Sequence, residues 1–140
     1  MSHDFAFWDT DAPLENEEAE AIYLELCRIG ASPGTRPSEK IATLARAIET
    51  HWPTPDPGRE DEWPLAAPPE VSDSHLIICL VPSRLWDVWP TLGDIAKAQE
   101  LVMYDPQQQN VFLPTRLSRA RTRVRAKKKR QAGQPRRAGR

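Results

Sequence analysis

The titratable and nucleophilic side chains of this chain form no pattern that specifies a reaction. The three histidines, His3, His51 and His75, have no second histidine or cysteine at the spacing of a metal site. Serine, threonine and cysteine occur outside any nucleophile motif, and the six glycines form no phosphate-binding loop. We therefore expect a binding protein that uses no metal or cofactor. A small enzyme that uses some of its many carboxylates is the alternative.

A short acidic run beside a tryptophan is the first candidate for a binding surface. Glu60, Asp61 and Glu62 directly precede Trp63, in a proline-rich stretch that also contains Asp56. Tryptophan is enriched at interface hot spots, and surrounding carboxylates steer a basic partner toward it. These residues predict a surface that binds a basic protein, and a solvated charge run is the alternative. We expect Trp63 to be the most exposed tryptophan and the other four to lie largely in the core: Trp8, Trp52, Trp86 and Trp89.

A second candidate lies where a predicted strand ends in Tyr104-Asp105-Pro106-Gln107. Asp and Pro are favoured turn formers, so a hairpin turn is one interpretation. The other is that Asp105 and Gln107 project from the carboxyl end of a strand, where sheets flanked by helices often place their binding sites. Both residues are therefore kept as candidates for partner binding.

The third candidate is a run of basic residues. Residues 116–140 contain 12 Lys and Arg and no Asp or Glu. No apolar stripe accompanies these charges, like charges repel, and Gly133, Pro135 and Gly139 follow, so we predict a disordered tail. It has no aromatic residue to stack on bases, which favours non-specific RNA or DNA contact, or docking on its own body. The predicted contacts with nucleic acid are Arg119, Arg121, Arg123, Arg125, Lys127, Lys128, Lys129 and Arg130.

The charge of the chain is divided between two parts of opposite sign. Residues 1–115 hold the remaining 7 basic residues and all 20 acidic ones, a net charge of about −13, so the overall −1 is a cancellation. We predict two parts, an acidic domain over residues 1–115 and the basic tail over residues 116–140. Two cysteines, Cys27 and Cys79, are expected to be buried free thiols. No signal or membrane-spanning pattern occurs, so a cytoplasmic protein is expected.

The elements that must position these residues follow from periodicity and from capping residues. Strands are predicted at residues 4–8, 75–81, 101–104 and 111–113. In the first, Phe5 and Phe7 share one face, and Ala6 and Trp8 the other. Helices are predicted at residues 14–29, at 39–51 with Ser38 as N-cap, and after residue 83. The first helix carries an apolar stripe from Ala19 to Ile29. Pro90 should kink the last helix or divide it in two. Residues 31–37 and 53–69 are predicted loops.

Together these elements predict an α/β (α+β) fold in the order β-α-α-β-α-β-β. Strands that are joined through helices usually run parallel, whereas the last two strands are close enough for an antiparallel hairpin. We expect a small mixed sheet of about four strands with helices packed on it.

Several short motifs carry a resemblance to a known group of proteins. They are Asp4-Phe5-Ala6-Phe7-Trp8, Ile22-Tyr23, Tyr104-Asp105-Pro106-Gln107 and Val111-Phe112-Leu113-Pro114. Over roughly residues 4–114 the chain resembles small bacterial immunity proteins that accompany polymorphic or contact-dependent toxins. The resemblance implies a cytoplasmic, toxin-neutralising binding protein whose acidic surface occludes a basic, nuclease-like partner. The basic tail departs from that group and predicts the alternative, a protein that binds RNA or DNA non-specifically.

Overall fold

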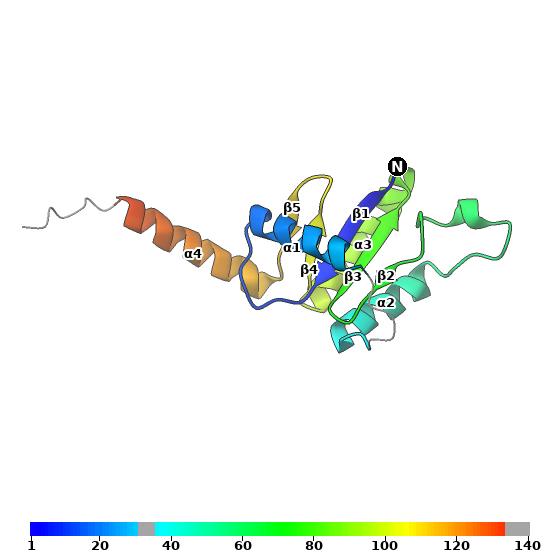
Figure 1. Cartoon of the computed structure of the whole chain (residues 1–140), viewed down its shortest axis with the longest axis horizontal. Helices are drawn as coiled ribbons and strands as arrows, with labels where there is room; N and C mark the ends of the chain where they lie inside the picture. Colours follow the sequence, from blue (N-terminus) through cyan, green and yellow to red (C-terminus); the bar gives the residue numbers. More distant parts are fainter. Residues whose placement is uncertain (31–35, 134–140) are drawn as a thin grey trace, which may run out of the picture.

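The computed structural model describes residues 1–30 and 36–133. Its centre is a five-stranded sheet in the order β2-β3-β1-β4-β5, in which every neighbouring pair is antiparallel (Figure 1). The strands are β1 (His3–Trp8), β2 (Glu70–Val71), β3 (His75–Leu80), β4 (Val102–Asp105) and β5 (Asn110–Phe112). The helices are α1 (Asn16–Ile29), α2 (Glu39–His51), α3 (Leu85–Ala98) and α4 (Thr115–Gly133), with short 3-10 turns η1 (Glu60–Glu62) and η2 (Pro82–Arg84).

The predicted α+β class is confirmed, but the predicted mixed sheet of about four strands is wrong. The sequence analysis missed the two-residue strand β2, which pairs with β3. It also predicted that strands connected through a helix run parallel within a mixed sheet. Strands β3 and β4, which α3 connects, do run in the same direction, because each is antiparallel to β1. They are not neighbours, because β1 lies between them and takes the hydrogen bonds of both.

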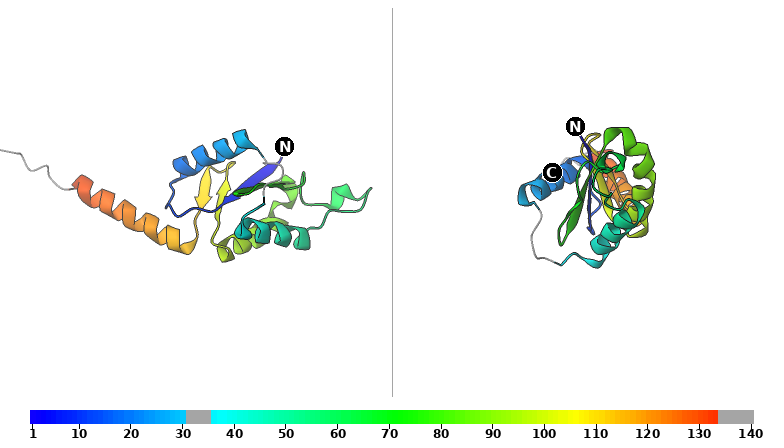
Figure 2. Two further views of the ribbon diagram at one scale, coloured as in Figure 1. Left: turned by 60° about the horizontal axis from the view of Figure 1, so that its bottom comes forward. Right: turned by 90° about the vertical axis from the view of Figure 1, so that its right-hand side faces the viewer.

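Helices cover both faces of the sheet (Figure 2). On one face Phe5 and Phe7 pack with α2 and α3, and on the other Ala6 and Trp8 pack with Ala19 of α1. This is the alternation that the sequence predicts for β1. Burial of both faces explains why β1 and β3 are apolar almost without interruption. The sheet is thus the rigid support from which the charged segments project.

The helix boundaries confirm some local signals and correct others. Helix α2 has the predicted bounds, and the Ser38 hydroxyl accepts a hydrogen bond from the Ile41 amide at 3.3 Å. Helix α1 begins at Asn16, two residues later than predicted, and Ile29 at the end of its predicted apolar stripe is exposed. Helix α3 is one element with Pro90 inside it, so the alternative in which Pro90 divides the helix in two is wrong. Cys27 is exposed and Cys79 half-buried, which corrects the expected burial of both thiols.

Helix α4 replaces most of the predicted disordered tail. It runs from Thr115 to Gly133, whereas residues 134–140, like residues 31–35, lie outside the described part of the chain. Leu117 in its first turn is buried against the α1 face of the core. This anchor and the high helix propensity of Ala, Arg, Lys and Gln offset the repulsion on which the prediction of disorder was based. Among the described helices, none is long and apolar enough to cross a membrane.

Candidate functional site

Helix α4 sorts its basic residues onto two sides. Arg121 donates to the Leu14 carbonyl at 3.3 Å, and Arg125 Nε donates to Glu15 Oε1 at 2.6 Å. Arg116 lies 3.5 Å from the Asp11 carboxylate. These contacts tie the first half of α4 to the segment between β1 and α1. The hydrogen bond from Arg125 also holds the pKa of the Glu15 carboxyl below its ordinary value, so this carboxylate is charged at neutral pH.

The side of α4 opposite Arg121 and Arg125 carries, beyond the paired Arg116, a basic stripe of four exposed residues: Arg119, Arg123, Lys127 and Arg130. At about 3.6 residues per turn these positions fall within a sector of about 80°, and they extend over about 17 Å of helix. Within the described part of the chain, no hydrogen bond or ion pair engages any of them. Helix α4 has no acidic residue, so the basic stripe is an uncompensated row of positive charge.

Two of the eight predicted nucleic-acid contacts are therefore engaged with the body, and six are not. Arg121 and Arg125 are the engaged pair. The stripe residues belong to the second group, together with Lys128 and Lys129, which lie on other sides of the helix. The alternating Arg residues at 119, 121, 123 and 125 look equivalent in the sequence. The helical turn of about 100° per residue separates them into two pairs on opposite sides of the helix.

The predicted acidic surface lies at the other end of the molecule. Residues 53–63, here called the acidic loop, connect α2 to the strands and project away from α4 along the long axis (Figure 1). Asp56, Glu60, Asp61 and Glu62 are all exposed in it. Glu60 accepts from the Gly58 amide at 3.0 Å, and Glu62 accepts from Arg59 at 2.9 Å, and each interaction lowers the pKa of its carboxyl. The loop thus presents ionised carboxylates at neutral pH.

Trp63 is not the exposed anchor that the sequence analysis predicted. Its side chain packs against the core on the α2–α3 face, and its indole Nε1 donates to the Trp52 carbonyl at 3.0 Å. Trp86 on α3 is instead the exposed tryptophan, with 78% of its surface accessible. A helical wheel could have identified Trp86, because it lies well away from the buried stripe of Val88, Leu92 and Ala96.

Asp105 and Gln107 form a structural turn. Asp105 is only 4% exposed, and its carboxylate accepts from the Gln107 and Gln108 amides at 3.0 and 3.2 Å. Its other oxygen lies 3.1 Å from Nε2 of His3, and the side-chain carbonyl of Gln107 accepts from the Asp4 amide at 3.1 Å. These bonds hold the β4–β5 turn on the start of β1. The structure therefore has the hairpin turn. The other interpretation, in which Asp105 projects from the end of the strand, is wrong.

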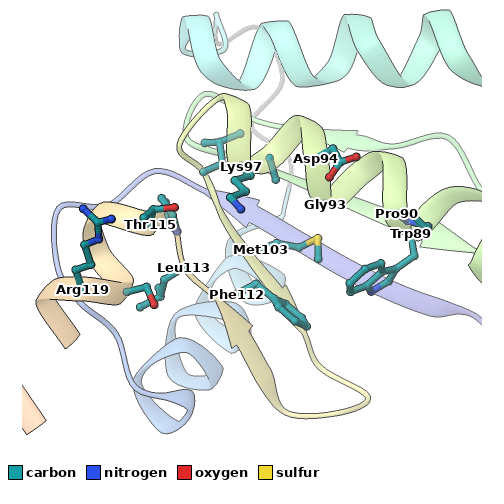
Figure 3. Close-up of a pocket in the computed structure, with 14 residues that line it drawn as sticks. Trp89, Pro90, Gly93, Asp94, Lys97, Met103, Phe112, Leu113, Thr115 and Arg119 are labelled. Atoms are coloured by element: carbon teal, nitrogen blue, oxygen red, sulfur yellow. The ribbon is translucent and has the colours of Figure 1, made fainter. Parts of the chain in front are cut away.

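A groove that the sequence analysis missed lies between α3, the β4–β5 hairpin and the start of α4 (Figure 3). This aromatic groove has a volume of about 480 Å³, and Trp89, Met103 and Phe112 line it. Lys97 reaches it from α3 and Arg119 from α4. The rings of Trp89 and Phe112 meet edge to face, with centroids 5.7 Å apart. Arg119 thus belongs both to the groove and to the basic stripe.

Within the described residues, no group of three or more His, Cys, Asp or Glu side chains could hold a metal ion. The Cys79 thiol is a poor nucleophile at neutral pH, because burial, followed by its interaction with Asp4, raises its pKa to about 11. Three surface features are present instead: a basic stripe, an aromatic groove and an acidic loop. In comparisons with protein-family models, curated proteins and solved structures, no match to this chain was found.

Proposed function

We propose that this protein is a non-catalytic binding protein that holds nucleic acid through the basic stripe of α4. The observation that supports this most directly is the one-sided row of Arg119, Arg123, Lys127 and Arg130 on a helix without any acidic residue. Nucleic acid presents a regular row of phosphates, and each cation that neutralises a phosphate releases condensed counterions. A straight row of positive charges on a helix is complementary to such a backbone.

Repulsion within α4 gives a second reason to expect a polyanion. Like charges lie four residues apart at four places along the helix: Arg119 with Arg123, Arg121 with Arg125, Arg123 with Lys127, and Arg125 with Lys129. Each such pair destabilises a helix by about 0.2–0.5 kcal/mol in water. Phosphates bound along the helix would neutralise this repulsion. Binding contacts of this kind carry no sequence information, so the proposed recognition is of the backbone.

The test is a titration of labelled 20-nucleotide DNA, single-stranded and duplex, with the full chain at 50 mM salt, followed by fluorescence anisotropy. We expect binding that weakens steeply with added salt. A stripe variant, R119Q/R123Q/K127Q/R130Q, should make the slope of log K against log salt on duplex DNA less negative by about 3.6, since each of the four phosphate contacts contributes about −0.9.

A matched control separates the stripe from charge in general. The variant R121Q/R125Q/K128Q/K129Q removes the same number of charges from the other sides of α4. We expect it to retain most of the affinity of the unmodified protein. Equal losses in the two variants would mean that the stripe is not the binding surface. No binding of either DNA at low salt would reject the proposed function.

A second candidate function is that the acidic loop binds a basic protein, as an immunity-like protein occludes a toxin. The observation that favours it is the exposure of Asp56, Glu60, Asp61 and Glu62 together at the end of the molecule far from α4. Arg59, the basic residue of the loop, pairs with Glu62. Three carboxylates of the loop are left to attract a basic partner. Both candidate functions fit a cytoplasmic protein, which is the compartment we propose.

Co-expression tests this second function. The protein would be produced together with the product of an adjacent toxin-like gene, with growth and complex formation as the readouts. We expect rescue and a complex, both of which are lost in D56N/E60Q/D61N/E62Q and kept in the stripe variant. Failure of the unmodified protein to bind or to rescue would reject the immunity-like function. It would leave the nucleic-acid function unaffected, because the two surfaces share no residue.

A further inference from the structure

The basic stripe of α4 leads into the aromatic groove through a shared residue. Arg119 is the first member of the stripe and lines the groove together with Lys97. Asp94 is the one carboxylate among the described residues that line this groove, although the body as a whole is strongly acidic. A phosphate chain that follows the stripe toward the body would therefore reach the groove without meeting a net negative charge.

The groove contains aromatic side chains, which α4 lacks. No aromatic residue occurs in α4, so the stripe can hold phosphates but cannot stack on bases. Trp89 and Phe112 are half-buried, and their rings line the groove from α3 and β5. Met103 lies beside Phe112 in the groove (Figure 3). Aromatic side chains beside a positive track are the combination by which proteins bind single strands without reading their sequence.

The groove is also of a suitable size for a base. Its volume of about 480 Å³ lies within the range of small-molecule pockets, which is about 300–1,000 Å³. A base in a duplex is stacked and paired, and extrusion of that base costs a few kcal/mol. A single strand does not have to be unpaired first, so the groove favours single strands over duplexes.

We infer that the protein prefers single-stranded nucleic acid, with one unpaired base held in the groove against Trp89 and Phe112, and phosphates along the basic stripe. This inference rests on the proposed nucleic-acid function and names its substrate class. Lys97 and Arg119 bind the phosphates on either side of the inserted base. The stripe supplies the affinity that single strands and duplexes share, and the groove supplies the difference between them.

The experiment compares two probes, a labelled 20-nucleotide oligothymidylate and the same strand paired with its complement. We expect the single strand to bind at least about 5-fold more tightly, since stacking of one base is worth about 1–3 kcal/mol. The variant F112L, which removes the ring but keeps an apolar side chain, should remove most of that preference and leave duplex binding unchanged. K97A should weaken the binding of the single strand more than that of the duplex.

The control W86A removes an exposed tryptophan that lies beside Trp89 but does not line the groove. We expect W86A to bind both probes as the unmodified protein does. Photocrosslinking gives a readout that does not depend on any variant. An oligonucleotide with 5-iodouracil should crosslink to the peptide that contains Trp89 or to the peptide that contains Phe112.

The outcomes separate this inference from the function on which it rests. Equal affinity for the two probes, or crosslinks confined to α4, would overturn the inference that the groove holds a base. The basic stripe would then remain as the nucleic-acid surface. A single-strand preference that survives in F112L and K97A would also overturn it. Absence of binding to both probes would reject the two proposals together.

Discussion

Helix α4 and the acidic loop are both highly charged segments that project from the body, yet they carry their charge in different ways. In the loop, the charges are partly satisfied at short range, through Arg59 with Glu62 and the Gly58 amide with Glu60. In α4, one side is bonded to residues about a hundred positions away in the sequence, at Leu14 and Glu15, and the basic stripe is left without partners in the described part of the chain.

The two segments share one feature, an apolar residue at the base that fixes the segment to the core. Leu117 does this for α4, where it is 1% exposed, and Trp63 does it for the loop. The charged residues farther along each segment can then remain exposed to solvent. The buried apolar side chain of the anchor supplies the contact with the core that charged side chains do not make. The anchors therefore hold the segments on the core and leave the charges exposed to solvent.

The largest expected effect is that of the anchor of α4. Leu117→Ala removes a fully buried side chain at the edge of the core, so we expect a loss of about 3 kcal/mol in the free energy of unfolding, measured with urea. Val124→Ala, two turns farther along the same helix and 42% exposed, should change it by less than about 0.5 kcal/mol. Equal effects would show that α4 is not anchored at its first turns.

A somewhat smaller loss is expected for the anchor of the loop. Trp63→Ala removes half-buried apolar surface and leaves the Trp52 carbonyl without its indole donor, which should cost about 2 kcal/mol in the free energy of unfolding. Trp86→Ala is the matched control, because Trp86 is exposed. If Trp86→Ala destabilises the protein as much as Trp63→Ala does, then the comparison of the two tryptophans fails.

A third prediction concerns the docked side of α4. Glu15→Gln removes the charge that holds Arg125, so hydrogen exchange of the amides in residues 120–126 should accelerate, with little change in the sheet. In the unmodified protein, added salt should accelerate the same amides, because exposed ion pairs are screened. Asp61→Asn in the acidic loop is the control and should leave these amides unchanged. Acceleration in the control would mean that global charge, and not this ion pair, docks the helix.

The smallest predicted effect is a pH dependence of the same contact. The pKa of Glu15 is lowered in the folded protein by its hydrogen bond from Arg125, so its contribution to docking is present above the ordinary pKa of the carboxyl. The contribution is lost as the pH falls through the lowered pKa. Exchange of residues 120–126, corrected for the intrinsic rate, should therefore accelerate in acid in the unmodified protein, and Glu15→Gln should show no such step.

Local patterns predicted much of the fold. The alternation of Phe5 and Phe7 with Ala6 and Trp8, and the Ser38 cap with α2 behind it, were readable from adjacent residues. The pairing of β1 with both β3 and β4 was not readable, because strand order depends on which distant segments meet. The candidate site shows the same division: the sequence identified which residues are charged, and missed the groove, whose walls come from α3, β5 and α4.

The class of the fold, the composition of each element and the separation of acidic from basic residues along the chain all follow from the order of the amino acids. Tertiary contacts were needed to show that Arg121 and Arg125 are hydrogen-bonded to the body, that the indole of Trp63 is bonded to Trp52, and that Asp105 is buried beside His3. The difference lies in the sequence distance over which each interaction acts. Periodicity and capping act over a few residues, whereas each of these outcomes depends on a hydrogen bond to a group that folding brings close.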